Sequence, residues 1–582
     1  MEFKEFALTA YELENTSSRL AMIDILSQLF KKADSNSIQK LIYLLQGRVA
    51  PPFEGIEVGV GEKFVEKAIA TATGYTPAQV EALFRKTGDL GIATEQLLEK
   101  KKQMALSAET LSVDYVFDTL LRIAKTGGEG SQDKKIKYLS DLLNRAVPLE
   151  GRYLVRIPLA NLQLGVGDPT MMEALSIALK GDNSLREEIE RAYNLSSDLG
   201  LTARKLYEGK KDIAEIKLFN PIRPALAERE TDSESILERH KTTMADLKLD
   251  GFRLQIHKKG DKVMLFSRRL ENMTHSFPDV IEIIRNNVRA EEAIIDSEAL
   301  AYNETTGEIY PFQYTIQRKR KHGVREKAEE LPLHVFAFDL IYLDGKNLID
   351  KPYKERRKLL EKVVKGEGIS VMESIKTSKI KELAKFFKKS IEIGAEGIVC
   401  KDPDAPYKAG MRGFNWIKLK RSYKGELADT IDVVVVGYYL GKGARAEFKF
   451  GGLLGAVYDE DEDTFKTIAR VGSGFTEEMM VSLREKFDRI KSKDKPARVD
   501  SLVKPDFWVK PMYVVTVKAD EITESPMHTA GWKGDAGYAL RFPRMVGGIR
   551  EDKKPEDATS VDEIKRMFKL QKHTAVQTTS ES

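Results

Sequence analysis

The stretch KLDGFR, residues 248–253, places a lysine, a carboxylate and an arginine around a glycine. Apolar and polar residues alternate over 252–257, which predicts a strand that begins just after the glycine. Gly251 allows a tight turn and a close approach of the backbone to a ligand. The pattern therefore places Lys248 near the start of a strand, at the rim of a pocket.

These residues also have chemical meaning. An uncharged lysine amine is a nucleophile, and burial or neighbouring cations lower its pKa toward the range where that form exists. Arg253 brings a planar set of donors that suits phosphate oxygens or a ribose hydroxyl. Taken alone, however, the stretch is also typical of an ordinary Asp-Gly turn before a strand. The rest of the chain has to decide between the two interpretations.

Length and composition limit what the chain can be. With 582 residues it is long enough for about three or four domains. Lysine and arginine number 94 against 90 acidic residues, a net charge of +4, so binding to nucleic acid would depend on local basic surfaces. Charged residues make up 32% of the chain and cysteine is nearly absent, which favours a protein from a thermophile.

The single cysteine, Cys400, excludes a disulfide framework and a four-cysteine zinc site within one chain. It indicates a reducing compartment. No apolar run approaches the roughly 20 residues of a membrane span, and the first residues lack the pattern of a signal peptide. We therefore expect a soluble, cytoplasmic, monomeric protein with no membrane contact.

Residues 1–216 show helical periodicity and an internal repeat. Three pairs of segments match in the same order along the chain: 25–33 with 138–146, 59–62 with 165–168, and 89–91 with 198–200. Matches in a conserved order predict a duplicated helical unit.

Two glycine-rich turns belong to this repeat, and each precedes a predicted helix. Free N–H groups at such a turn bind anions, for example a DNA phosphate. A duplicated unit would offer two such contacts to a duplex, which assigns DNA binding to Gly59, Gly61, Gly165 and Gly167. Tight helix packing is an alternative role that accounts for these glycines equally well.

The two prolines of residues 220–224 end the helical region. Beyond them, strand-like runs alternate with helices as far as Lys420, which is typical of an α+β domain. From Ile431 onward, short strands and turns predict a small β-barrel. The expected fold is multi-domain, with a helical domain over 1–216, an α+β domain over 217–420 and a barrel over 421–582.

Charged residues recur at or near predicted strand ends after Lys248. Arginines follow one strand at 268–269, and Lys418 and Lys420 alternate with apolar residues, so both ammonium groups point to one face of a strand. Glu298 and Glu396 add two carboxylates, which suit Mg²⁺ because it prefers oxygen ligands. Cations and a metal in one pocket would also keep Lys248 uncharged for attack.

In their order, these motifs resemble those of ATP-dependent DNA ligases, and most of all the archaeal type. The resemblance rests on KLDGFR at 248–253, SRR at 267–269, DSE at 296–298, FAFDLIYLDG at 336–345, EGIV at 396–399, WIKLK at 416–420, and RFPR at 541–544 followed by REDK at 550–553. It covers nearly the whole chain. It implies a DNA-binding domain at 1–216, an adenylation (nucleotidyltransferase) domain at 217–420 and an OB-fold domain at 421–582.

The resemblance also implies an activity. Lys248 would attack the α-phosphate of ATP, release pyrophosphate and carry AMP. The AMP would pass to the 5′-phosphate of a nick in duplex DNA, and the 3′-hydroxyl would then displace it to seal the strand. Stacking on a base barely distinguishes purines, so the choice among ATP, ADP, GTP and NAD⁺ stays open.

The resemblance further implies a role for each motif residue. Phe338 would stack on adenine, Glu298 would hold the ribose or a metal-bound water, and Glu396 would bind Mg²⁺ or Mn²⁺. The remaining residues would contact the nucleotide or the nick phosphate (Asp246, Arg253, Arg268, Arg412, Lys418 and Lys420) or orient the leaving pyrophosphate (Arg541, Arg544 and Lys553).

Other proteins that share parts of this pattern define the alternatives. RNA ligases and RNA-capping guanylyltransferases have the lysine motif but usually lack so long a helical domain. An NAD⁺-dependent DNA ligase needs a cysteine zinc site, and a catalytically silent DNA-binding scaffold would not keep the ordered motifs. In the ligase family the helical domain often binds a sliding clamp through a glutamine-led motif. The segment QMAL at 103–106 lies in that region but lacks the usual paired aromatics, so clamp binding is a hypothesis.

Overall fold

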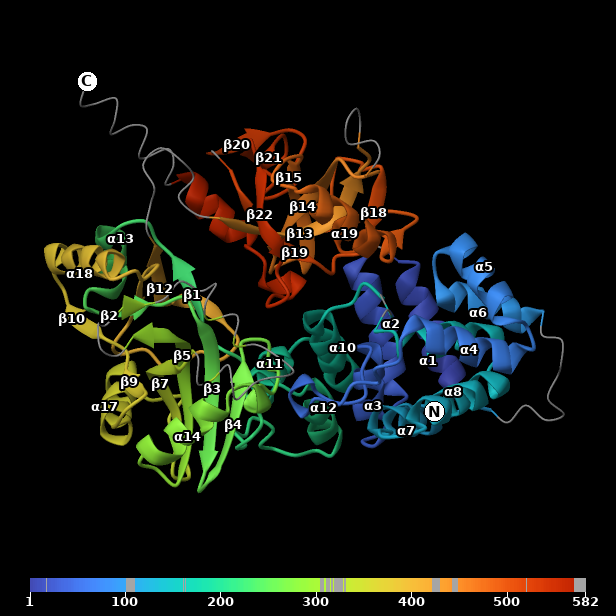
Figure 1. Ribbon diagram of the computed structural model, residues 1–582, viewed down its shortest axis with the longest axis horizontal. Coiled ribbons are helices and arrows are strands. Elements are labelled where there is room, and N and C mark those ends of the chain that lie inside the picture. Colours follow the sequence, from blue (N-terminus) through green and yellow to red (C-terminus); the bar gives the residue numbers. More distant parts are fainter. Residues whose placement is uncertain are drawn as a thin grey trace.

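The computed structural model describes the chain in three parts, with the C-terminal part lying across the other two (Figure 1). The described residues are all except 17, 101–109, 161, 163, 304–307, 310–314, 316–317, 319–327, 329–330, 421–429, 442–447, 520 and 570–582. Among them, no helix has the length and apolar character needed to cross a membrane.

The first part is helical, as predicted, and has one continuous apolar core that runs from Phe3 to Ala203. Its elements are α1 (Phe3–Glu14), α2 (Arg19–Lys31), α3 (Ser37–Leu45), η1 (Pro52–Glu54), α4 (Glu62–Thr73), α5 (Pro77–Thr87), α6 (Leu90–Glu99), α7 (Val113–Lys125), α8 (Ser131–Arg145), α9 (Pro148–Arg156), α10 (Asp168–Lys180), α11 (Arg186–Ser196) and α12 (Leu199–Tyr207).

The repeated segments correspond to helices that pack across the two repeats. Helix α2 of the first repeat packs on α10 of the second, and α4 packs on α8; likewise α3 packs on α12, and α6 on α9. The recurring Asp-Leu-Gly segments begin helices α6 and α12, because Asp89 and Asp198 accept hydrogen bonds from the backbone N–H groups of Ile92 and Leu201, each at 2.9 Å. The two repeats are therefore interlocked rather than stacked end to end.

Two sheets and their flanking helices form the central part. Its elements are β1 (Leu226–Arg229), α13 (Ser233–His240), β2 (Thr243–Lys248), β3 (Phe252–Lys259), β4 (Lys262–Ser267), η2 (Thr274–Ser276), α14 (Pro278–Asn287), β5 (Glu292–Asn303), β6 (Glu308–Ile309), β7 (Leu333–Leu343), β8 (Lys346–Asn347), α17 (Tyr353–Val363), β9 (Ile369–Val371), β10 (Ser374–Thr377), α18 (Ile380–Glu392), β11 (Gly397–Lys401) and β12 (Arg412–Lys420).

Each central sheet carries part of the motif set. One has the order β1-β12-β11-β2-β10, and the other has the order β4-β3-β5-β7-β8 with β6 and β9 attached. An apolar cluster that includes Leu247, Phe338 and Ile417 joins residues of the two sheets. The predicted alternation of strands and helices as far as Lys420 is confirmed.

The C-terminal part is rich in strands, as predicted. Its elements are β13 (Ile431–Tyr439), β14 (Gly452–Asp459), β15 (Thr464–Val471), α19 (Glu477–Asp488), β16 (Lys491–Ser492), β17 (Val499–Asp500), β18 (Phe507–Val509), β19 (Val514–Lys518), β20 (Glu521–Ser525), β21 (Gly537–Arg541), β22 (Arg544–Ile549) and η5 (Pro555–Asp557), followed by a helix at 561–569.

A closed OB-fold barrel is not confirmed. Within the described residues the sheet runs β16-β18-β13-β14-β15-β17, with β19 and β22 attached through β13. One bridge joins Ser473, just after β15, to Arg544 at the start of β22, and the N–H of Met545 donates to the Ser473 carbonyl at 2.9 Å. The two edges touch there without forming a ladder, so the sheet is curved but is not a closed barrel.

Candidate active site

Lys248 is the last residue of β2 and lies beside two other motif strands. In the register of the sheet, Gly397 of β11 is opposite Lys248 on one side and opposite Lys420 of β12 on the other. Glu396 immediately precedes β11, and its N–H donates to the Lys248 carbonyl at 2.9 Å. Strand pairing therefore brings three separate motifs to one point.

The side chains at this point form an ion-pair cluster. The Lys248 ammonium contacts the Glu396 carboxylate, and Lys420 Nζ lies 3.2 Å from Glu396 Oε2. Burial raises the pKa of Glu396, but Lys248 and Lys420 outweigh it and lower this pKa to about 2. Glu396 is therefore ionised at any physiological pH.

The same contact corrects one expectation about Lys248. We expected neighbouring cations to lower the pKa of the nucleophile. Burial does lower it, but Glu396, Glu298 and Asp250 together outweigh burial and raise the pKa above its ordinary value. In this state Lys248 is protonated, because these three carboxylates stabilise its ammonium form.

Glu298 reaches the pocket from the second sheet. It lies on β5 opposite Arg253 of β3, and its Oε1 accepts a hydrogen bond from the Gly251 N–H at 3.1 Å. Burial raises the pKa of Glu298 to about 7 against the effect of Lys248 and Arg253. A Cβ atom at Gly251 would lie 2.6 Å from the Ala299 carbonyl, so the approach between β3 and β5 requires glycine.

An aromatic pair lies behind these charges. Phe338 of β7 and Trp416 of β12 meet edge to face with ring centroids 6.0 Å apart, and both are buried. The Arg253 guanidinium lies 5.4 Å from the Phe338 ring and forms an ion pair of 2.8 Å with buried Asp296. Arg253 thus packs against the expected base-stacking residue while Asp296 fixes its position.

Asp246 does not have the position expected of a direct nucleotide contact. Its side chain is 2% exposed and is fully engaged below the pocket. Oδ2 accepts a hydrogen bond from the Tyr353 hydroxyl at 3.0 Å and lies 2.7 Å from Lys401 Nζ, while Oδ1 lies 3.4 Å from Arg357 Nη1. The sequence motif placed Asp246 near Lys248 correctly, but these buried cations orient its carboxylate inward.

Sequence reasoning missed Lys401, the last residue of β11. Its buried ammonium donates to the Phe338 carbonyl at 3.1 Å and lies 4.7 Å from the Phe338 ring and 4.4 Å from that of Trp416. Lys401 follows the EGIV motif with one residue, Cys400, between them. A lysine at the end of a buried strand was a usable signal, since such a charge needs a partner.

Arg412 and Lys418 are engaged by the C-terminal part. Their cationic groups lie 2.6 Å and 3.1 Å from the two carboxylate oxygens of Glu563, which belongs to the helix at 561–569. Burial lowers the pKa of Lys418 to about 8, although Glu563 opposes this. A second ion pair, Arg566 with Glu228, joins the same helix to β1. The expected nucleotide contacts are thus covered by an internal carboxylate.

The predicted pyrophosphate contacts do not gather at Lys248. Arg541 is paired with Glu521 at 2.5 Å across the β20–β21 ribbon, Arg544 lies at the start of β22, and Lys553 contacts Asp432. Exposed Arg268 faces this region, since it lowers the pKa of Lys553 along with burial.

Arg550 of the C-terminal part interacts electrostatically with Asp250 of the KLDGFR motif. It is among the cations that oppose the effect of burial on the pKa of Asp250. Sequence reasoning noted Arg550 within the REDK segment but assigned it no role.

Both Gly-Val-Gly turns directly precede helices, as predicted. Gly61 is the N-cap residue of α4 and Gly167 that of α10, and Gly59 and Gly165 have φ angles of 56° and 73°. Such left-handed φ values favour glycine. Their contact with DNA stays a prediction. The clamp segment at 103–106 lies outside the described residues.

The carboxylates near Lys248 fit a divalent metal of the kind that ATP chemistry uses. Within the described residues, no group of three or more His, Cys, Asp or Glu side chains could hold a metal ion by itself. Glu298 and Glu396 both lie close enough to Lys248 to raise its pKa. Mg²⁺ is usually bound through one or two carboxylates together with waters and substrate phosphates, so a pair is sufficient.

Comparison with known proteins gives the family. The family model described as ATP dependent DNA ligase domain matches residues 224–420, which hold the whole site. A probable DNA ligase of Dictyoglomus turgidum is 48% identical over 587 residues, covering 100% of both chains. The chain belongs to the ATP-dependent DNA ligase family.

Other matches extend over the remaining parts of this ligase family member. The models described as DNA ligase N terminus and ATP dependent DNA ligase C terminal region match residues 2–176 and 446–553. The DNA ligases of Hyperthermus butylicus and Saccharolobus shibatae are 44% and 43% identical, and each alignment covers 98% of both chains. The expected resemblance to archaeal ligases is confirmed.

Proposed function

We propose that the protein seals nicks in duplex DNA with ATP, through a covalent bond between Lys248 and AMP. The observation that carries the proposal is the position of Lys248. It is the last residue of β2, beside β11, and it contacts Glu396, while its neighbour Leu247 belongs to the apolar cluster that contains Phe338. A nucleophile, a carboxylate pair and an aromatic ring are the groups that adenylylation requires.

In the first step, Lys248 Nζ attacks the α-phosphorus of ATP. The N–P bond forms as the bond to pyrophosphate breaks, and the ammonium must first give up a proton. The proton leaves to solvent, because Glu396, with a pKa of about 2, is too weak a base to hold it. Lys420 lies next to Glu396 and would stabilise the charge that develops on the α-phosphate.

Glu298 and Glu396 would hold Mg²⁺, or Mn²⁺, whose charge would neutralise the phosphates. Phe338 would stack on adenine, and Arg253, held by Asp296, would keep the ring in place. Asp246 would act from below by fixing Lys401, and not by touching the nucleotide.

AMP would then pass to the 5′-phosphate of the nick, and the 3′-hydroxyl would displace it as the new phosphodiester forms. Arg268 and Arg412 would contact the nick phosphate, and the turns at 59–61 and 165–167 would grip the duplex backbone. Because Arg412 is now paired with Glu563, the C-terminal part must move before this step. An earlier movement of the C-terminal part, in the first step, would bring Arg541, Arg544 and Lys553 to the pyrophosphate before it leaves.

We also propose that the protein works as a monomer in the cytoplasm. Clamp binding through residues 103–106 is testable separately, because a Gln103→Ala, Leu106→Ala variant should lose affinity for the clamp and keep its adenylylation. Unchanged clamp affinity in that variant would remove the hypothesis.

The test of the main proposal is the mass of the protein after incubation with ATP and Mg²⁺. The wild type should gain one AMP, and Lys248→Ala should gain none. Lys376→Ala is the matched control, because Lys376 is an exposed lysine of β10 in the same sheet and should label normally. Equal labelling of Lys248→Ala would show that the nucleophile is another residue. Sealing of nicked DNA compared with nicked RNA then decides the substrate.

A further inference from the structure

A second buried contact joins the C-terminal part to the helical part, at the start of α10. The Thr170 hydroxyl donates to Asp463 Oδ2 at 2.7 Å, and the two residues are 1% and 2% exposed. Asp463 ends the hairpin turn between β14 and β15 with a φ of 51°, and the Tyr458 hydroxyl donates to its Oδ1 at 2.8 Å. The turn thus presents a fixed carboxylate to the first turn of α10.

Neighbouring residues extend this contact over the second glycine turn. Arg498 Nη2 lies 2.5 Å from Asp463 Oδ1, and a Cβ atom at Gly167 would lie 3.2 Å from the same guanidinium. A Cβ atom at Gly165 would lie 3.5 Å from Ala497 Cβ, and Ala497 packs against the core of the helical part. We call this surface the α10 interface; it consists of Gly165, Gly167 and Thr170 on one side and Asp463, Ala497 and Arg498 on the other.

Asp463 occupies a place that chemistry assigns to an anion. The N-terminus of a helix carries partial positive charge and unpaired N–H groups, which favour a phosphate or a carboxylate. The turn at 165–167 is one of the two proposed DNA grips. In this structure the C-terminal part covers it and places the Asp463 carboxylate, which is paired with Arg498, against Thr170 in the first turn of α10.

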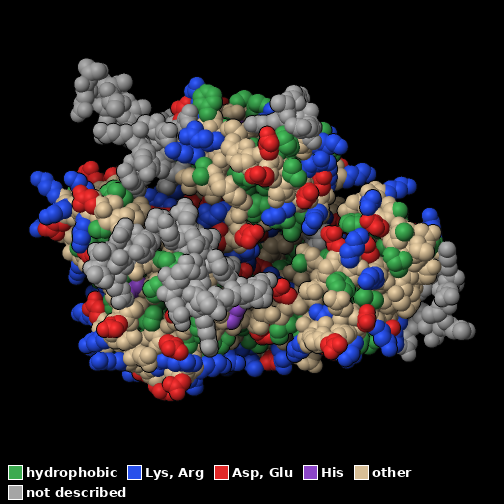
Figure 2. Space-filling view, in the orientation of Figure 1, with side chains coloured by type: hydrophobic (Ala, Val, Ile, Leu, Met, Phe, Trp, Pro, Cys, Tyr) green, Lys and Arg blue, Asp and Glu red, His purple; other side chains and the backbone are tan. Residues whose placement is uncertain are grey.

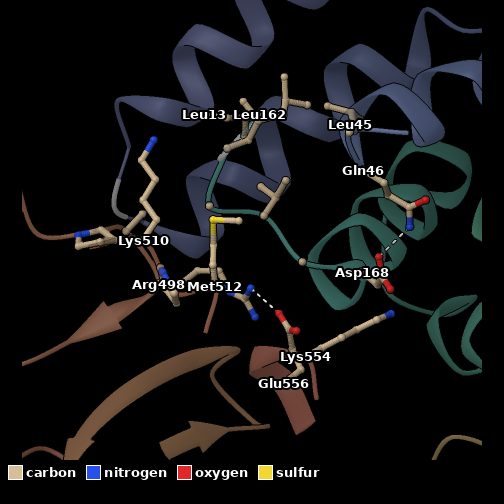
Figure 3. A pocket seen from close by; sticks show the side chains of 18 of the residues that line it. Leu13, Leu45, Gln46, Leu162, Asp168, Arg498, Lys510, Met512, Lys554 and Glu556 are labelled. Atoms are coloured by element: carbon tan, nitrogen blue, oxygen red, sulfur yellow. Dashed lines mark hydrogen bonds and ion pairs between the residues drawn. The ribbon is translucent and has the colours of Figure 1, made fainter. Parts of the chain in front are cut away.

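The interface also borders a cavity of about 1570 Å³ whose lining holds more cations than carboxylates, with Arg48, Arg223 and Lys510 among the cations. In Figure 3 Lys510 points up from the C-terminal strands toward the helices, and Lys554 extends toward Asp168. Burial lowers the pKa of Lys510 to about 8, and Arg156 lowers it further against the opposing effect of Glu14 and Asp89. In the closed arrangement, in which the C-terminal part contacts the helical part, these cations lie close together. Their mutual repulsion disfavours this arrangement.

The hollow where the three parts meet is visible on the surface (Figure 2). Its cation-rich lining suits the phosphates of nucleic acid. A duplex that entered it would meet the α10 interface at one wall. The closed arrangement and bound DNA therefore compete for the same residues.

We propose that the α10 interface is an autoinhibitory contact in which Asp463 takes the place of a backbone phosphate, and that nicked duplex DNA opens the protein by displacing it. This inference rests on the proposed function, because the displacing ligand is the DNA that the enzyme seals. The internal group that has to leave is the Asp463 carboxylate.

The test uses the full chain with two single substitutions outside the proposed catalytic residues and DNA contacts. Thr170→Val removes the hydroxyl that donates to Asp463 while keeping the side-chain shape. Ala497→Gln adds bulk opposite Gly165 without adding charge. Thr73→Val is the matched control, because the buried Thr73 hydroxyl donates only within its own helix, to the Ile69 carbonyl at 2.7 Å.

Two measurements separate the possible outcomes. Small-angle X-ray scattering of the free protein should show a larger radius of gyration for both interface variants than for the wild type and the control. Stopped-flow anisotropy should show several-fold faster association with nicked duplex DNA. An unchanged radius of gyration in both variants would overturn the closed contact, and a larger radius with unchanged association would overturn the competition with DNA. A wild type that binds no DNA would refute the proposed function, while scattering would still decide the interface.

Discussion

Lys248 is held in its charged form by the carboxylate that it contacts. In the described structure Glu396 stabilises the ammonium, and Lys420 shares the same carboxylate. Attack on phosphorus needs the neutral amine, so the resting pocket protects the nucleophile until the substrate changes the balance of charge around it. The acidic residues of the site thus have two roles, storing the lysine in an unreactive state and placing it for attack.

A substitution at Gly251 tests whether the close approach of β3 and β5 stabilises the fold. Gly251→Ala would place a Cβ atom 2.6 Å from the Ala299 carbonyl, and we expect the strain to lower the free energy of unfolding by about 1–3 kcal/mol. It should also slow AMP labelling, because the Gly251 N–H holds Glu298. Gly413→Ala is the control, since nothing lies within 4 Å of its added Cβ. Denaturant titration measures the effect, and equal stability of the two variants would contradict it.

Variants of Lys401 and Asp246 test how much this buried ion pair, which lies next to Phe338, stabilises the protein. Lys401→Met leaves a buried carboxylate with fewer partners, and we expect a loss of about 3–5 kcal/mol in unfolding free energy. The double variant Lys401→Met, Asp246→Asn should recover part of that loss, because the second change removes the uncompensated charge. Strictly additive losses in a denaturant titration would show that the two side chains do not interact.

At the scale of elements, the helix at 561–569 decides which motif residues are available. Its Glu563 is 4% exposed and binds cations from both ends of β12, so on the proposed function the helix would compete with the nucleotide for Arg412 and Lys418. Strand β12 is shared between the catalytic pocket and this helix. The position of one short helix therefore controls access to the phosphate-binding cations.

Removing the Glu563 charge should activate the first step. Glu563→Gln keeps the shape but loses the ion pairs, and we expect AMP labelling to become several-fold faster because Lys418 and Arg412 are released. Asp562→Asn is the matched control on the same helix, since Asp562 pairs with Lys565 at an exposed site. Quenched-flow mass spectrometry gives the rates. A slower reaction in the Glu563 variant would mean that the helix assists catalysis.

The interlocked repeats predict how the helical part folds. Because α2 packs on α10 and α4 packs on α8, neither repeat has its partners when isolated. We expect a fragment of residues 1–216 to unfold in one cooperative transition and a fragment of residues 1–110 to be largely unstructured. Circular dichroism with urea titration measures both. A stable, cooperative short fragment would show that the repeats fold independently.

At the scale of the whole molecule, the C-terminal part is in contact with both others. Glu563 binds the central part and Asp463 binds the helical part, so one body covers the nucleotide contacts and one of the two proposed DNA grips together. Release of either contact would weaken the other, because a single rigid movement breaks both. Internal carboxylates thus cover the residues that we propose contact the nucleotide and one of the proposed DNA grips.

Thermal stability is a property of this whole assembly. The chain has 32% charged residues, and many of them form the ion pairs described above. Ion-pair networks are most useful at high temperature, where the cost of desolvating charges falls. We expect a melting midpoint above the roughly 65 °C limit of ordinary mesophile domains, measured by differential scanning calorimetry. A midpoint within the mesophile range would contradict the inference from composition.

Local patterns were sufficient for much of the fold. Alternation predicted the strand that follows Gly251, and helical periodicity predicted the helical character of residues 1–216. They succeeded because capping, turns and strand pattern depend on residues close together in the chain. The predicted barrel is not confirmed, because closure of a sheet depends on how strands far apart in the chain meet at its edges.

By itself, the sequence determined the family, the order of the parts and the residues that gather around Lys248. Only the tertiary structure decided which charge pairs with which: Asp246 with Lys401, Arg412 with Glu563, and Thr170 with Asp463. These partners lie far apart along the chain, and burial in low dielectric makes each charge bind whichever opposite group the packing places beside it. Motif order cannot specify that choice, because it depends on how the parts dock.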